Sequence, residues 1–148
     1  MPQTGIFNYP SIDRIVFGEP LIEAVQKEAD RLSVERIFVL ASGTISRETP
    51  CIEDLRATMK GKIAGVFDRL RPHVQRDDVI AATVEARAVQ ADLILTIGGG
   101  TPTDAAKMVS FCLANDVSEY EDLDPLRWVS NPDGTAVQPP SKVPTVRS

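Results

Sequence analysis

A run of three glycines, Gly98–Gly100, is the part of this sequence whose residue types are best suited to chemistry. It follows the apolar run Asp92–Ile97 and precedes a helical pattern that extends from about Asp104 to Ala114. Because glycine lacks a Cβ atom, such a backbone can adopt positive φ and let a phosphate approach closely. Free amides at the start of the next helix would point at the anion. Residues 98–101 therefore indicate a phosphate-binding loop.

The same residues also fit a turn that binds no ligand. Thr101 could cap the following helix, with Pro102 at its first position and Asp104 reaching back as the acidic member of a capping box. The two interpretations are compatible. The spacing is not GxGxxG, because Thr103 occupies the third glycine position, so the ordinary dinucleotide fingerprint is absent.

Alternating strand-like and helix-like segments surround this loop and would position it. Crossover helices between short apolar runs predict an α/β fold with a mostly parallel, doubly wound, Rossmann-like sheet of about five strands and flanking helices. Ligands of such sheets bind at the carboxyl ends of the strands, where the glycine run lies. The predicted strands are Ile12–Phe17, Arg36–Ala41, Lys62–Phe67 and Asp92–Ile97.

The helices between these strands are predicted from the spacing of their apolar residues. One begins after Pro20 and a shorter one ends at Gly61. A longer one opens at Asp77-Asp78, where two carboxylates favour the helix dipole. Its expected buried stripe is Ile80, Val84, Ala88 and Ala91.

Length, charge and composition narrow the function classes. The 148 residues allow one ordinary domain, and 16 basic against 21 acidic residues (net −5) disfavours nucleic acid and membrane surfaces as partners. No apolar stretch is long enough to span a membrane and the N-terminus lacks the pattern of a signal peptide, so we expect a cytoplasmic location. Cys51 and Cys112 form no CxxC pair, and His73 is the only histidine, so no transition-metal site is signalled.

The character of the chain changes after Asn115. Five of the 11 prolines fall in the last 24 residues, which argues against a regular helix or a central strand there. We therefore divide the chain into a dinucleotide-binding α/β domain over residues 1–115 and an irregular, proline-rich tail over 116–148. Tyr120 and Trp128 of this tail are expected to pack on the edge of the sheet domain.

The segment Ile97–Lys107, IGGGTPTDAAK, resembles the GGGSxxDxAK signature of the iron-dependent (group III) alcohol dehydrogenases, which are related in fold to dehydroquinate synthase. Similarity extends from about Phe7 to Ala114. Phe67-Asp68 and Pro72-His73 resemble the family's "D…PNP" loop, and Ala91-Asp92 resembles its "GAD" strand entry.

This resemblance implies a nicotinamide dinucleotide, NAD or NADP, as the cofactor. Gly98, Gly99, Gly100 and Thr101 would hold its pyrophosphate, and Asp104 would lie at the same helix start toward the nicotinamide side. His73 stands where relatives often carry an asparagine that faces the adenosine part; the alternatives are a solvated loop residue for His73 and a helix cap for Asp104. Ser42 replaces an aspartate that holds the ribose hydroxyls in many relatives. A neutral hydroxyl does not repel a 2′-phosphate, so the choice between NAD and NADP stays open.

The family's catalytic iron (Fe²⁺) is held by an aspartate and three histidines on a helical C-terminal domain. His73 cannot supply such a set, so the resemblance implies a truncated cofactor-binding half that is inactive alone, with no catalytic or metal residue of its own. The full-length enzyme would transfer hydride between the cofactor and an alcohol or aldehyde, or a keto acid, and members commonly form homo-oligomers. The alternatives are a non-catalytic nucleotide-binding module and a scaffold in which the glycines form only a turn.

Overall fold

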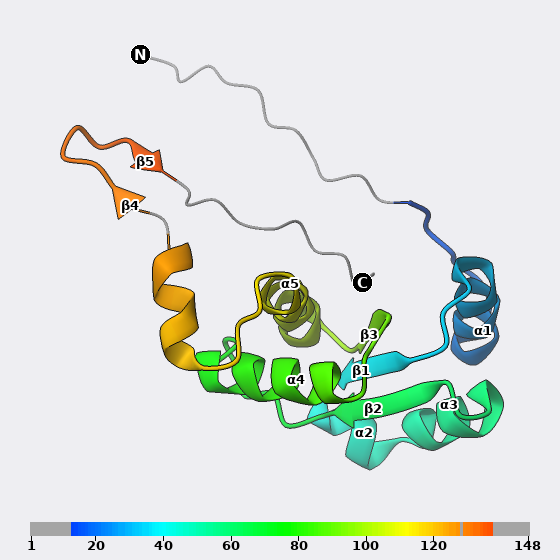
Figure 1. Ribbon diagram of the computed structural model, residues 1–148. Coiled ribbons are helices and arrows are strands. Elements are labelled where there is room, and N and C mark those ends of the chain that lie inside the picture. The colour runs from blue at the N-terminus through cyan, green and yellow to red at the C-terminus, as the bar shows by residue number, and fades with distance from the viewer. Residues whose placement is uncertain (1–12, 128, 138–148) are drawn as a thin grey trace.

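The computed structural model describes residues 13–127 and 129–137, and its centre is a parallel β-sheet. The strands are β1 (Ile37–Ala41), β2 (Ile63–Phe67) and β3 (Leu93–Ile97), in the order β2-β1-β3 (Figure 1). Every residue of the central strand β1 is buried. The predicted α/β fold with a parallel sheet is therefore confirmed, with three strands in the described part of the chain in place of about five.

Helices cover both faces of this sheet because side chains alternate along its strands. Phe38 and Leu40 of β1 belong to one hydrophobic core, and Ile37, Val39 and Ala41 belong to the other. Helices α1 (Leu21–Leu32) and α3 (Cys51–Met59) close the core of Ile37, with α2 (Gly43–Glu48) beside them, whereas α4 (Arg76–Ala88) and α5 (Gly100–Ala114) close the core of Phe38 (Figure 1). The crossovers after β1 and after β2 thus run over opposite faces.

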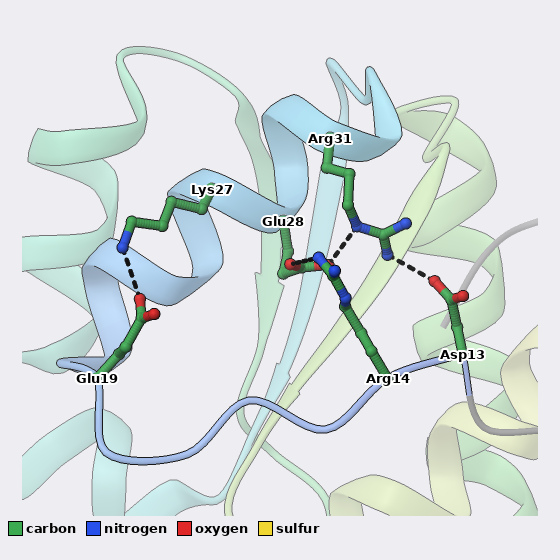
Figure 2. A network of polar contacts seen from close by, with 6 residues as sticks. All are labelled: Asp13, Arg14, Glu19, Lys27, Glu28 and Arg31. Carbon is green, nitrogen blue, oxygen red and sulfur yellow. Dashed lines mark hydrogen bonds and ion pairs between the residues drawn. The ribbon is translucent and has the colours of Figure 1, made fainter.

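The strand predicted over Ile12–Phe17 is wrong for residues 13–17, and Ile12 lies outside the described residues. These residues pair with no strand of the sheet. They run beside α1 instead, where Arg14 pairs with Glu28 at 2.8 Å and Asp13 pairs with Arg31 at 2.6 Å (Figure 2). Phe17 is 89% exposed. The apolar alternation alone could not reveal that the segment pairs with no strand within residues 13–127 and 129–137.

The buried face of α4 also differs from the expected one. The helix buries Asp78, Val79, Ala82, Thr83 and Ala86, whereas Val84 of the predicted stripe is 45% exposed. The apolar residues of α4 are distributed around the helix, so their spacing does not single out one buried face. The small side chains of Ala82 and Ala86 face the core, which allows close packing.

The residues after Asn115 contain short elements that the sequence did not predict. A 3₁₀ helix, η1 (Tyr120–Leu126), is followed by a hairpin of β4 (Val129–Ser130) and β5 (Ala136–Val137). Tyr120 is 44% exposed and its hydroxyl accepts a hydrogen bond from Arg76 of α4, in keeping with the expected packing on the domain. Trp128 lies outside the described residues.

An ion pair fixes the loop between β2 and α4. The guanidinium of Arg71 donates to Oδ1 of Asp78 from Nη2 at 2.8 Å and from Nε at 3.0 Å, and the Arg71 backbone amide donates to Oδ2 at 2.8 Å. These hydrogen bonds, together with the positive charge, lower the pKa of Asp78. The start of α4 is thereby tied to the loop that leads to it.

Asp78→Asn should lower the free energy of unfolding by about 1–2 kcal/mol at pH 7, because the amide keeps the shape but loses the charge that Arg71 binds. A lowered folded-state pKa stabilises the protein above the unfolded pKa of about 3.9, and this contribution is lost as pH falls toward the folded-state value. In urea denaturation, the gap in the free energy of unfolding between parent and variant should therefore narrow below about pH 4. Asp77→Asn is the control, since Asp77 is 78% exposed and lies 3.8 Å from Arg71. A gap that stays constant down to about pH 3 would contradict this role.

Candidate functional site

The candidate site lies at the carboxyl ends of β1 and β3, where the helices that follow these two strands cover opposite faces of the sheet. β1 and β3 are parallel neighbours, yet β1 continues into α2 on one side of the sheet and β3 continues into α5 on the other. The Ser42 amide donates to the carbonyl oxygen of Ile97 at 2.9 Å, which holds the two strand ends together. In doubly wound sheets such a switch point leaves a crevice at the carboxyl ends of the strands, and ligands bind there.

Gly98 makes the turn from β3 into α5, and a side chain there would be tightly packed and strained. Its φ is +142°, and an added Cβ atom would lie 3.0 Å from Cγ of Pro102 and 3.1 Å from Cβ of Ser42. Gly99 and Gly100 differ, because nothing lies within 4 Å of a Cβ atom added at either position. The first glycine therefore serves the turn, and the next two leave open space above the start of the helix.

Helix α5 begins at Gly100 with Gly99 as its N-cap, so the predicted cap at Thr101 is wrong. No side chain caps this helix, and Asp104 pairs with Lys107 at 2.9 Å without reaching back to the helix start. No acceptor among the described residues receives a hydrogen bond from the amides of Gly99, Gly100 or Thr101. Uncapped amides at a helix start can bind an anion. The tight turn thus explains why residue 98 is a glycine, but it does not explain the glycines at positions 99 and 100.

A hollow of about 410 Å³, the switch-point hollow, opens beside this helix start. Its lining includes Ser42 and Gly43 after β1, Arg47 of α2, Thr101 of α5 and the loop after β2 from Asp68 to Pro72. Ser42 caps α2 by accepting a hydrogen bond from the Ile45 amide at 3.3 Å. Ser42 and Thr101 are two predicted site residues that the fold brings to one cavity.

A larger groove of about 810 Å³, the α4–α5 groove, lies between residues of α4, α5 and η1. His73 and Asp104 line it together with apolar residues such as Met108, Phe111 and Leu123. The structure therefore groups His73 with Asp104 and separates both from Ser42. His73 has a φ of +66° and Val74 one of +50°, an uncommon left-handed pair that turns the loop into α4.

Five polar residues of the switch-point hollow were not among the predicted site residues, namely Thr44, Arg47, Asp68, Arg69 and Arg71. Asp68 accepts a hydrogen bond from the hydroxyl of Ser46 in α2 at 2.6 Å. They come from two segments of the chain that meet only because β1 and β2 are neighbours. The "D…PNP" resemblance included Asp68 without giving it a role, and no motif indicated the three arginines.

Within residues 13–127 and 129–137, no three His, Cys, Asp or Glu side chains lie close enough to hold a metal ion. The residues that the structure describes therefore do not fit an iron site. The helices among these residues also include none with the length and apolar character needed to cross a membrane.

Comparison with known proteins places this geometry in a family. The model of the iron-containing alcohol dehydrogenases matches residues 12–147. Dehydrogenase FUM7 of Gibberella moniliformis is 34% identical over 113 residues, which are 76% of this chain and 26% of that protein. Maleylacetate reductase 1 of Cupriavidus pinatubonensis is 33% identical over 100 residues, 68% of this chain and 27% of that one.

The fold agrees with these sequence matches. The crystal structure of maleylacetate reductase from Agrobacterium tumefaciens matches 98% of this chain and 41% of its own, with a TM-score of 0.63 and 22% identity. The chain spans about a quarter of the length of the curated relatives it matches. With the family model covering residues 12–147, this chain belongs to the iron-containing alcohol dehydrogenase family and corresponds to its N-terminal region.

Proposed function

We propose that this chain is the NAD(P)-binding part of an oxidoreductase that transfers hydride between a nicotinamide cofactor and an alcohol or aldehyde, or a keto acid. The observation that carries the proposal is the uncapped start of α5 at the switch point, where Gly99 and Gly100 leave open space. Family membership supplies the chemistry, because the cofactor accepts or donates the hydride when bound.

The residues of this chain would bind and orient the cofactor. The amides of Gly99, Gly100 and Thr101 would donate to the pyrophosphate, because no described residue accepts from them and the helix dipole favours an anion there. The switch-point hollow, with Ser42 and Thr101 in its lining, would hold the adenosine end. The α4–α5 groove is the larger of the two and is lined by Asp104, so it is the space left for the nicotinamide end.

Under this assignment His73 faces the nicotinamide half of the cofactor, not the adenosine half that the family resemblance implied. Because no described residues fit iron, we assign no metal step to this chain. Reduction or oxidation of the substrate would depend on residues outside those that the structure describes.

Gly100→Val tests the phosphate site separately from the fold. The side chain would enter open space above the helix start, where the cofactor phosphates would lie, so NAD affinity should fall roughly tenfold or more while the melting temperature changes little. Isothermal titration calorimetry and thermal denaturation measure the two effects. Gly98→Ala provides the opposite pattern, because it is strained at φ +142° and should lose stability first.

The control for Gly100→Val is Glu53→Val, which introduces the same side chain in the first turn of α3 at an exposed position. It should leave NAD affinity unchanged. Equal NAD affinity in the parent chain and in Gly100→Val would refute the assignment of the pyrophosphate to this helix start.

Ser42→Asp tests where the adenosine ribose binds. Aspartate is as good an N-cap as serine, so α2 should keep its start. A carboxylate here would repel a 2′-phosphate, so NADP affinity should fall roughly tenfold or more while NAD affinity is retained or improved. The check is titration of both cofactors against the parent and the variant, and an unchanged NADP-to-NAD ratio would place the ribose elsewhere.

A further inference from the structure

Arg47 is a charged residue of the switch-point hollow that has no partner among the residues the structure describes. It is exposed, in the last turn of α2, and within the described part of the chain it forms no ion pair or hydrogen bond. The two other arginines of the hollow differ in this respect. Arg71 is held by Asp78, and Arg69 is held by Glu85.

The guanidinium of Arg47 lies directly over the backbone of Gly43. A Cβ atom added to Gly43 would be 2.5 Å from Nη2 and 2.6 Å from Nη1 of Arg47. These contacts are too close for a real side chain, so the absence of one at Gly43 gives the guanidinium its place. This position is one residue from Ser42, whose hydroxyl replaces the carboxylate of many relatives.

The charges around the hollow favour an anion. Its lining holds three guanidinium groups, those of Arg47, Arg69 and Arg71, and one carboxylate, that of Asp68. Asp68 already accepts a hydrogen bond from Ser46 at 2.6 Å, and Arg71 is taken up by Asp78. Considering the described residues alone, Arg47 is therefore the cation of this lining that is free to bind an anionic ligand.

We infer that Arg47 determines cofactor choice by binding the 2′-phosphate of NADP at the switch-point hollow. This inference rests on the proposed function, because it requires the adenosine end to lie beside Ser42. A guanidinium presents several donors in a planar fork that matches the oxygens of a phosphate. NAD has a hydroxyl at the same position and would gain little from the cation. The chain should consequently bind NADP more tightly than NAD.

The test compares the parent chain with Arg47→Gln, and with Arg47→Lys as the variant that keeps the charge. Calorimetric titrations would use NADP, NAD, and the fragments adenosine 2′,5′-bisphosphate and ADP. Arg47→Gln should lose roughly 10- to 100-fold in affinity for NADP and for the bisphosphate, with NAD and ADP unchanged. Arg47→Lys should recover part of the loss. Because Arg47 is exposed and unpaired among the described residues, both variants should keep the parent melting temperature.

Gly43→Ala supplies a second test that leaves the charge in place. The added methyl group would displace the guanidinium, so NADP affinity should fall without a comparable change for NAD. If Arg47→Gln leaves NADP affinity unchanged, or weakens NAD and NADP equally, the role of Arg47 is refuted while the proposed function stands. If the folded parent chain binds neither cofactor, the proposed function fails and this inference fails with it.

Discussion

The turn at Gly98 is so tightly packed that a Cβ atom there would press on its neighbours, and the arrangement of the site depends on this close packing. The residue joins the carboxyl end of β3 to α5 while packed against Pro102 and Ser42, with a φ of +142°. This close packing brings the start of α5 beside the end of β1, where the Ser42 amide also bonds to the Ile97 carbonyl. A side chain at this point would press on Pro102 and Ser42 and strain the backbone, so glycine is the residue that suits this close approach.

The sheet order explains why this turn lies next to an open space. Since β1 is buried on both faces and its two neighbours are β2 and β3, the helices that follow β1 and β3 leave in opposite directions. Two cavities are lined by residues of α5. The smaller has a polar, positively charged lining around Arg47, and the larger is mostly apolar around Met108 and Phe111. Their difference in character is consistent with a ligand that has one charged end and one flatter, less polar end.

Much of the fold could be predicted from the sequence because its central strands are continuous apolar runs bounded by turn residues. The strands at 37–41, 63–67 and 93–97 lie inside the predicted ranges, and the glycine run was located at the correct strand end. The errors have physical causes. Residues 13–17 have a strand-like pattern, but they pair with no strand in the described part of the chain. The predicted buried stripe of α4 is wrong because apolar residues are distributed around that helix. The predicted cap of α5 at Thr101 is wrong because the helix begins within the glycines.

The site was predicted less completely than the fold. The sequence predicts residues 98–101 as a site because they are consecutive. Arg47 and Asp68, in contrast, line the same hollow only because β1 pairs with β2. The local spacing of residues in the sequence does not indicate which distant segments line the same cavity. The opposite holds for His73, which the family resemblance associated with Ser42 but which the fold turns toward Asp104 through two left-handed residues.

Binding of the cofactor at the start of α5 can be tested directly by a two-dimensional ¹H–¹⁵N NMR titration of the folded chain with NAD. The amide signals of Gly99, Gly100 and Thr101 should shift with a common, saturable dependence on NAD concentration, and inorganic pyrophosphate should move the same three signals. Signals of the hairpin β4–β5 should stay in place. A well-dispersed spectrum in which NAD leaves those three amides unmoved would contradict the claim that the start of α5 binds the cofactor.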